Sequence, residues 1–168
     1  METRLEHILT HAYKADMISH LATHHEDFDE AIQLAVSDKQ PYSWRAAWLL
    51  WSCMEENDPR IRDYIRIMIN AIPSKKDGHQ RELLKILQQM EIGEEDEGYL
   101  FDVCVTIWEK IHNRPSVRWH AFNTIVSIAK RYPWLFNEIH FLAEDHYLDT
   151  LSPGIKNSIT RMIKDFSE

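Results

Sequence analysis

The chain has 168 residues, of which 44% are hydrophobic and 27% are charged, a composition typical of a globular domain and not of a disordered segment. Its net charge of −8 argues against nucleic-acid binding, because that affinity depends mainly on neutralising phosphates. Only four glycines are present, which disfavours β-sandwich and α/β folds with their many tight turns. We therefore expect a single all-α domain over residues 1–168.

Apolar residues recur with helical spacing along nearly the whole chain. In residues 27–37, for example, Phe28, Ala31, Ile32 and Ala35 form a stripe on one helical face. The predicted helices cover about 2–12, 13–24, 27–37, 42–57, 59–72, 78–91, 97–112, 115–131, 133–147 and 153–166. Fraying or fusion near the N-terminus would reduce these ten stretches to about eight helices.

Capping signals agree with several of these boundaries. Asp58 and Ser152 each precede a proline, which suits a capping side chain followed by proline at the first helical position. Asp77 followed three residues later by Gln80 resembles a capping box with Asp in the capping role. These signals predict helices that begin at residues 59, 78 and 153.

Nothing in the sequence indicates secretion or membrane insertion. The first residues lack the apolar segment of a signal peptide. The longest unbroken apolar stretch, residues 46–51, is far too short to span a bilayer. Cys53 and Cys104 lie in apolar helical runs, which predicts buried, reduced thiols. We expect a cytoplasmic protein that does not bind membranes.

The sequence also resembles itself. Shifted by 74 positions, residues 41–59 align with residues 115–133 without a gap, and Ala47 aligns with Ala121. Half of this shift is about 37 residues, the length of one helical hairpin. Repeats of two helices each are the units of α-solenoids.

One copy of the repeat carries a recognisable family pattern. A proline is followed by a Val-Arg pair, a small residue and then an apolar residue one turn on, namely Pro115, Val117, Arg118, Ala121 and Ile125. This pattern resembles the HEAT/armadillo-like superfamily, and residues 43–51 look like those of small bacterial HEAT-like repeat proteins. The resemblance implies a short right-handed superhelix of antiparallel helical hairpins, in which the second helix of each repeat lines a concave surface.

Three tryptophans share one helical face. Trp44, Trp48 and Trp51 follow the spacing i, i+4, i+7, which could form a stacking platform for a ligand. However, Ala46 and Leu50 make the opposite side apolar as well, so the helix is expected to pack between neighbours. The predicted core is Trp48, Trp51, Met54, Ile65, Ile69, Val105, Trp108, Phe122, Ile125 and Leu142.

Metal-binding and catalytic patterns are weak. The pairs His7/His11 and His20/His24 have the i, i+4 spacing that can bridge a metal ion, but no third ligand is evident on a separate element. They are interpreted as solvated polar faces. The sequence contains no phosphate-binding loop, no dinucleotide-binding motif and no nucleophile elbow. We therefore expect no catalytic residues, no cofactor and no metal.

One positive spot stands out in the acidic chain. Arg60, Arg62, Arg66 and Asn70 share one side of the predicted helix 59–72, opposite its isoleucines. The resemblance would place these side chains on the concave surface. They either form ion pairs between repeats, which contribute little at a surface, or anchor an acidic peptide or partner loop.

Two functions remain open. The first is a non-catalytic scaffold module that binds a protein or peptide, possibly an acidic one, on a concave face. The second is a DNA-repair enzyme, because alkylpurine DNA glycosylases are HEAT-like. The resemblance to them would imply a basic clamp around DNA and a pocket lined by aromatic and acidic side chains. The acidic charge and short length disfavour the second function.

Overall fold

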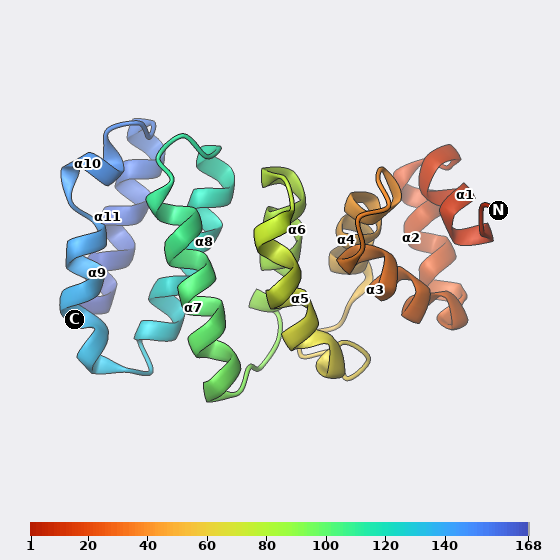
Figure 1. Cartoon of the computed structure of the whole chain (residues 1–168), viewed down its shortest axis with the longest axis horizontal. Coiled ribbons are helices and arrows are strands. Elements are labelled where there is room, and N and C mark those ends of the chain that lie inside the picture. The colour runs from red at the N-terminus through yellow and green to blue at the C-terminus, as the bar shows by residue number, and fades with distance from the viewer. Residues whose placement is uncertain (168) are drawn as a thin grey trace. The chain divides into compact units, whose positions relative to one another are not determined.

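The computed structural model describes residues 1–167, and in this range it contains helices and no strands (Figure 1). The predicted all-α fold is confirmed. By internal packing the chain divides into two compact units, Met1–Ile92 and Gly93–Glu168. The expectation of one domain over residues 1–168 stays a prediction. None of the described helices is both long enough and apolar enough to cross a bilayer.

The first unit centres on one helix. Its α-helices are α1 (Arg4–His11), α2 (Lys14–Thr23), α3 (Phe28–Val36), α4 (Tyr42–Cys53), α5 (Ile65–Ala71) and α6 (Asp77–Gln88). Helix α4 packs against α1, α2, α3 and α6, while α3 also contacts α5. The pairs α3–α4 and α5–α6 are therefore hairpins, and α4 and α6 are their second helices. Ala46, Ala47 and Leu50 in α4 are fully buried.

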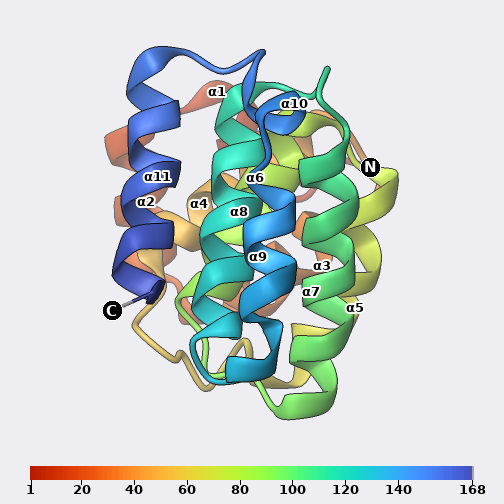
Figure 2. The same ribbon diagram turned by 90° about the vertical axis from the view of Figure 1, so that its left-hand side faces the viewer.

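The second unit is built around α8. Its α-helices are α7 (Glu94–Glu109), α8 (Pro115–Ala129), α9 (Phe136–Leu142), α10 (Asp145–Leu148) and α11 (Pro153–Ser167). Figure 2 shows α8 between α7 and α11, and α8 packs against α7, α9 and α11. Ala121 in α8 is fully buried, like Ala47 in α4 of the first unit, so the two aligned alanines both serve close helix packing.

The core of the second unit contains a buried guanidinium group. Arg118 is 0% exposed, and its Nε and Nη2 donate hydrogen bonds to the backbone oxygens of Trp108 and Tyr147 at 3.0 and 2.7 Å. Both oxygens lie near the C-terminal ends of helices, α7 and α10, where carbonyl groups lack partners within the helix. Arg118 of the family pattern therefore ties α8 to the C-terminal ends of α7 and α10.

Two predicted boundaries are wrong around residue 58. The helix predicted over 42–57 ends at Cys53, and the chain turns at Asn57, whose φ is 49°. The carboxylate of Asp58 accepts hydrogen bonds from the backbone N–H groups of Glu55 and Arg60. It therefore caps a loop and does not start a helix. The helix predicted over 59–72 is shorter, because 3₁₀ turns at Arg62–Tyr64 and Ile72–Ser74 flank α5.

The remaining caps gave mixed results. Ser152 Oγ accepts a hydrogen bond from the N–H of Ile155 at 3.4 Å, so the predicted start of α11 at a proline is confirmed. The capping box at Asp77 is wrong, because Lys76 occupies the capping position and Asp77 is the first helical residue. The helix predicted over 133–147 is a 3₁₀ turn, Pro133–Leu135, followed by α9 and α10.

Most of the predicted core is buried. Ile65, Ile69, Trp108, Phe122, Ile125 and Leu142 are buried, while Trp48, Met54 and Val105 are partly buried. Trp51 is 38% exposed, so its predicted place in the core is wrong. The fully buried apolar residues of α4 are instead its alanines and leucines, while Trp44 and Trp51 are 40% and 38% exposed.

Candidate functional site

The structure places Arg60 in the loop before α5 and not on the helix. Its Nε and Nη2 donate to the carboxylate of the fully buried Asp58 at 3.0 and 2.7 Å. Its guanidinium carbon lies 3.6 Å from the centre of the Phe28 ring. Burial alone would raise the pKa of Asp58, but the hydrogen bonds from Arg60 and from two backbone N–H groups lower it. Arg60 therefore anchors the loop to α3.

The other members of the predicted positive spot lie on neighbouring turns. Arg62 is in a 3₁₀ turn and donates to the side-chain oxygen of Asn57, while Arg66 and Asn70 are on α5. Because α5 is the first helix of its hairpin, the resemblance does not carry these residues to the surface formed by second helices. Partner binding by Arg60, Arg62, Arg66 and Asn70 stays a prediction.

The tryptophan stripe of α4 forms one wall of a hollow that we call the tryptophan cleft. The cleft has a volume of about 490 Å³, and its apolar wall consists of Met17, Trp44 and Trp48. Trp44 is 40% exposed, which corrects the expectation that this helix is enclosed on all sides. The sequence pattern showed the stripe, but could not show that α2 and α6 leave it open.

Charged side chains from three helices complete the tryptophan cleft. They are Lys14 on α2, Arg45 on α4, and Arg81, Glu82 and Lys85 on α6. Four cations and one carboxylate thus converge on a hollow within a chain whose net charge is −8. The lining of the cleft therefore carries a local excess of positive charge although the chain as a whole is acidic.

The lysines of the cleft lie against its aromatic rings. The Nζ of Lys14 is 5.5 Å from the centre of the Trp48 ring, and the Nζ of Lys85 is 3.7 Å from that of the adjacent Trp51. Such cation–π contacts hold an ammonium group beside an aromatic surface without neutralising its charge. These contacts therefore fix the positions of the two ammonium groups beside the rings.

The single carboxylate of the cleft is already paired. Glu82 is 1% exposed, and its Oε1 accepts a hydrogen bond from Nη2 of Arg81 at 3.2 Å. Its Oε2 lacks a hydrogen bond of ordinary geometry, but lies 3.2 Å from the Nζ of Lys85. A carboxylate so buried needs these cations, because an unpaired buried charge is costly. Among the residues that the structure describes, Lys14 and Arg45 are the cleft cations recorded without a carboxylate partner, and Nη1 of Arg45 donates to the backbone oxygen of Leu9 at 2.8 Å.

Neither cysteine has the surroundings of an activated nucleophile. Burial raises the pKa of Cys53 and of Cys104, and Cys104 is fully buried. A reactive cysteine needs a lowered thiol pKa and access to solvent.

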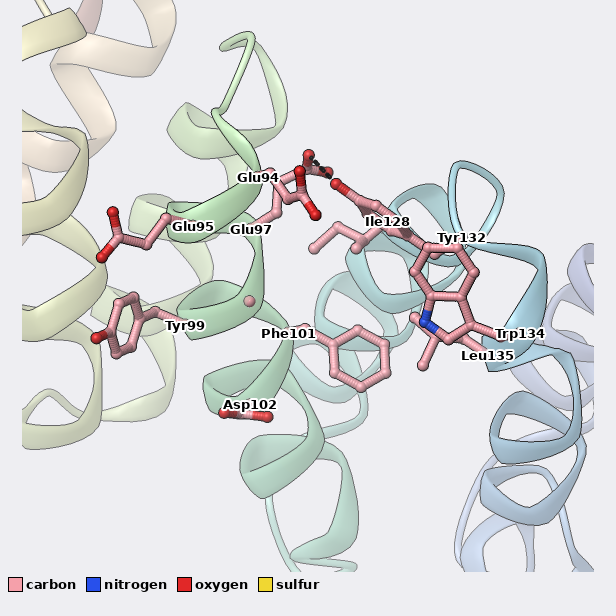
Figure 3. Close-up of a pocket in the computed structure, with 11 residues that line it drawn as sticks. Glu94, Glu95, Glu97, Tyr99, Phe101, Asp102, Ile128, Tyr132, Trp134 and Leu135 are labelled. Atoms are coloured by element: carbon pink, nitrogen blue, oxygen red, sulfur yellow. Dashed lines mark hydrogen bonds between the residues drawn. The ribbon is translucent and has the colours of Figure 1, made fainter.

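A second hollow, in the other unit, has the opposite charge (Figure 3). This acidic pocket has a volume of about 450 Å³, and four of its lining residues are carboxylates, namely Glu94, Glu95, Glu97 and Asp102. Figure 3 shows Phe101, Trp134 and Leu135 turned toward one another on one side of α7. Trp134 is 74% exposed.

The acidic pocket has a structural explanation. Glu94, Glu95 and Glu97 belong to the first turn of α7, where negative charge stabilises the helix dipole. Glu97 is 4% exposed and accepts hydrogen bonds from Arg131 and, at 3.1 Å, from the hydroxyl of Tyr132. Burial first, and then this hydrogen bond, raise the pKa of Tyr132. The three glutamates therefore favour the start of α7, and Glu97 also joins this helix to the turn that follows α8.

Comparison with known proteins agrees with the fold. The chain matches the model of the HEAT repeat domain over residues 1–166. No significant match was found among curated proteins or among solved structures. The chain therefore belongs to the HEAT repeat family, whose domains are typically helical scaffolds without catalytic activity.

Proposed function

We propose that this member of the HEAT repeat family is a non-catalytic scaffold module that holds an acidic segment of another protein in the tryptophan cleft. The observation that carries the proposal is the convergence of four cations and two tryptophans in one hollow of an acidic chain. Charge of this sign selects acidic partners, and the half-exposed rings supply apolar contact area.

The size of the cleft supports a peptide ligand. A volume of about 490 Å³ accommodates a few side chains, comparable to the hollows that bind small ligands. Lys14 and Arg45 sit on two helices beside Trp44 and Trp48, so an acidic side chain and a neighbouring aromatic one can be engaged together. Aromatic and arginine residues are the types that most often dominate binding energy.

The test is fluorescence anisotropy with two labelled decapeptides. One contains alternating glutamates around a phenylalanine, and the other has lysine in place of every glutamate. We expect the acidic peptide to bind and the basic one not to bind. Lys14→Glu and Trp44→Ala should each weaken binding about tenfold or more, whereas Lys130→Glu, which makes the same charge change just after the end of α8, should not. Lys85 is left intact because it pairs with Glu82.

The same assay distinguishes binding in the cleft from binding at the predicted positive spot of Arg60, Arg62, Arg66 and Asn70, called the arginine spot below. If Arg62→Glu/Arg66→Glu abolishes binding while Lys14→Glu and Trp44→Ala leave it unchanged, the peptide binds at the arginine spot and the cleft proposal is wrong. Equal binding of the acidic and basic peptides would also contradict the proposal, since no charge selection would remain.

One observation speaks for the DNA-repair alternative. The cleft combines tryptophans with a buried carboxylate, Glu82, as an aromatic-and-acid pocket would. The net charge of −8 opposes binding to a long polyanion. A labelled DNA duplex at low salt is therefore added to the assay, and DNA binding that Trp44→Ala removes would favour this alternative over the peptide.

A further inference from the structure

Two adjacent helices end in the same five-residue pattern. Residues 7–11 and 20–24 both read His-x-x-Thr-His, at the C-terminal ends of α1 and α2. In the first pair the rings of His7 and His11 stack with centres 4.0 Å apart and planes 14° apart. In the second pair the rings of His20 and His24 stack at 4.0 Å and 13°. The backbone geometry thus presents both pairs in the same way.

The second histidine of each pair is oriented by the backbone. Nδ1 of His11 lies 3.0 Å from the carbonyl oxygen of His7, and Nδ1 of His24 lies 2.9 Å from that of His20. A carbonyl oxygen can only accept, so Nδ1 carries the hydrogen and Nε2 of a neutral ring carries the lone pair. A histidine that donates one N–H to a carbonyl and offers its other nitrogen is typical of metal ligation.

The two pairs differ in their carboxylate. Asp27, which faces His20 at 2.7 Å, is also bound through both oxygens by Arg4 Nη2 at 3.0 Å, so its charge is already neutralised. Glu2 faces His7 at 3.3 Å, and among the described residues no lysine or arginine is recorded in an ion pair with it. The hydroxyl of Tyr42 donates to its other oxygen at 3.1 Å and so orients the carboxylate.

We propose that Glu2, His7 and His11 form a binding site for a divalent transition-metal ion of the zinc class. One nitrogen from each histidine and one carboxylate oxygen lie within 4.8 Å of one another. All three residues are exposed, so small side-chain rotations can bring the atoms to the roughly 2.0–2.2 Å that zinc requires.

The donor set selects among metals. Two imidazoles and one carboxylate suit zinc, with water in the fourth position, whereas calcium and magnesium prefer oxygen ligands throughout. The third ligand comes from the residues before α1. Spacing along a helix could not show it, since Glu2 lies outside the helix that carries the histidines.

The site is tested by titration calorimetry with Zn²⁺ on the full chain without a polyhistidine tag. We expect one tight site in the unmodified protein and no comparable binding of Mg²⁺. Glu2→Gln and His11→Asn should each lower the affinity more than about 100-fold, beyond the 10–100-fold typical for loss of a partner that only orients a ligand. Tyr42→Phe, which removes such a partner, should lower it about tenfold.

His24→Asn is the matched control, because it removes the equivalent histidine of the other pair. It should leave the affinity unchanged. A second readout is the melting temperature, which Zn²⁺ should raise in the unmodified protein and in His24→Asn, but not in His11→Asn. Circular dichroism checks that each variant is folded. Absence of Zn²⁺ binding, binding that persists in Glu2→Gln/His11→Asn, or binding lost in His24→Asn would each overturn the proposal.

Discussion

A cation lies over a tryptophan ring in each unit, but the two pairs have different surroundings. In the first unit, the Nζ of Lys85 is 3.7 Å from the ring centre of Trp51, and this ring is 38% exposed. In the second, the guanidinium carbon of Arg118 is 4.3 Å from the ring centre of Trp108, and both residues are fully buried. The same kind of contact thus occurs both at the surface and in the core.

The difference follows from the hydrogen bonds available to each cation. Arg118 directs its N–H groups to the backbone oxygens of Trp108 and Tyr147, which compensates for the loss of water. Lys85 has Glu82 as its charged neighbour, and its side chain remains 19% exposed. The guanidinium of an arginine carries several N–H donors in one plane and can be buried beside helix ends. A lysine usually keeps its ammonium group in water.

The tryptophan cleft and the acidic pocket also differ in their surroundings, namely in the charge of the residues that line them. The tryptophan cleft and the acidic pocket have similar volumes, about 490 and 450 Å³, and both include exposed tryptophan. Their ionised groups differ in sign, because the first is lined by cations from three helices and the second by the first turn of α7. Charge, and not size, separates their possible ligands.

The largest effect is expected in the buried pair. Trp108→Ala should lower the free energy of unfolding by about 3–5 kcal/mol, because it leaves a large cavity and removes a hydrogen bond to Leu142. Denaturant titration measures this loss. Trp134→Ala in the same unit is the control and should change stability by less than about 0.5 kcal/mol, since that ring is 74% exposed. Similar losses in both variants would contradict the contrast between core and surface.

An intermediate effect is expected for the buried guanidinium. Arg118→Met keeps most of the side-chain volume but leaves the carbonyls of Trp108 and Tyr147 unpaired, which should lower the free energy of unfolding by about 2–3 kcal/mol. Arg161→Met on α11, an exposed position, makes the same charge change as a control. An Arg118→Met protein as stable as the original would mean that desolvation of the charge outweighs its hydrogen bonds.

The smallest effect is expected in the surface pair. The burial predicted from the sequence would make Trp51→Ala as costly as a core substitution. With the ring 38% exposed, we expect a loss of only about 1–2 kcal/mol, since less apolar area is buried and no closed cavity forms. The measurement is the same denaturant titration. A loss as large as that of Trp108→Ala would show that the ring is enclosed and that the cleft is closed beside it.

Part of the candidate site could be foreseen. The sequence showed the tryptophan stripe of α4 and the two histidine pairs, because both follow from helical spacing alone. It also indicated the arginine spot, but placed Arg60 on a helix when this residue belongs to a loop held by Asp58. That error arose because a proline after an aspartate suits a turn as well as a helix start.

The sequence by itself determined the all-α class, the approximate positions of the helices and membership of the HEAT repeat family. The class and the helix positions follow from local periodicity, from few glycines and from the repeat that relates residues 41–59 to 115–133. The family follows from the resemblance at residues 115–125 and from the match over residues 1–166. Only the tertiary structure decided which side of α4 stays open, that Glu82 joins Trp44 and Trp48 in one cleft, and that Glu2 lies beside His7. Helical spacing defines the faces of each helix, but the neighbours that cover a face come from residues far away in the chain, and their packing decides burial.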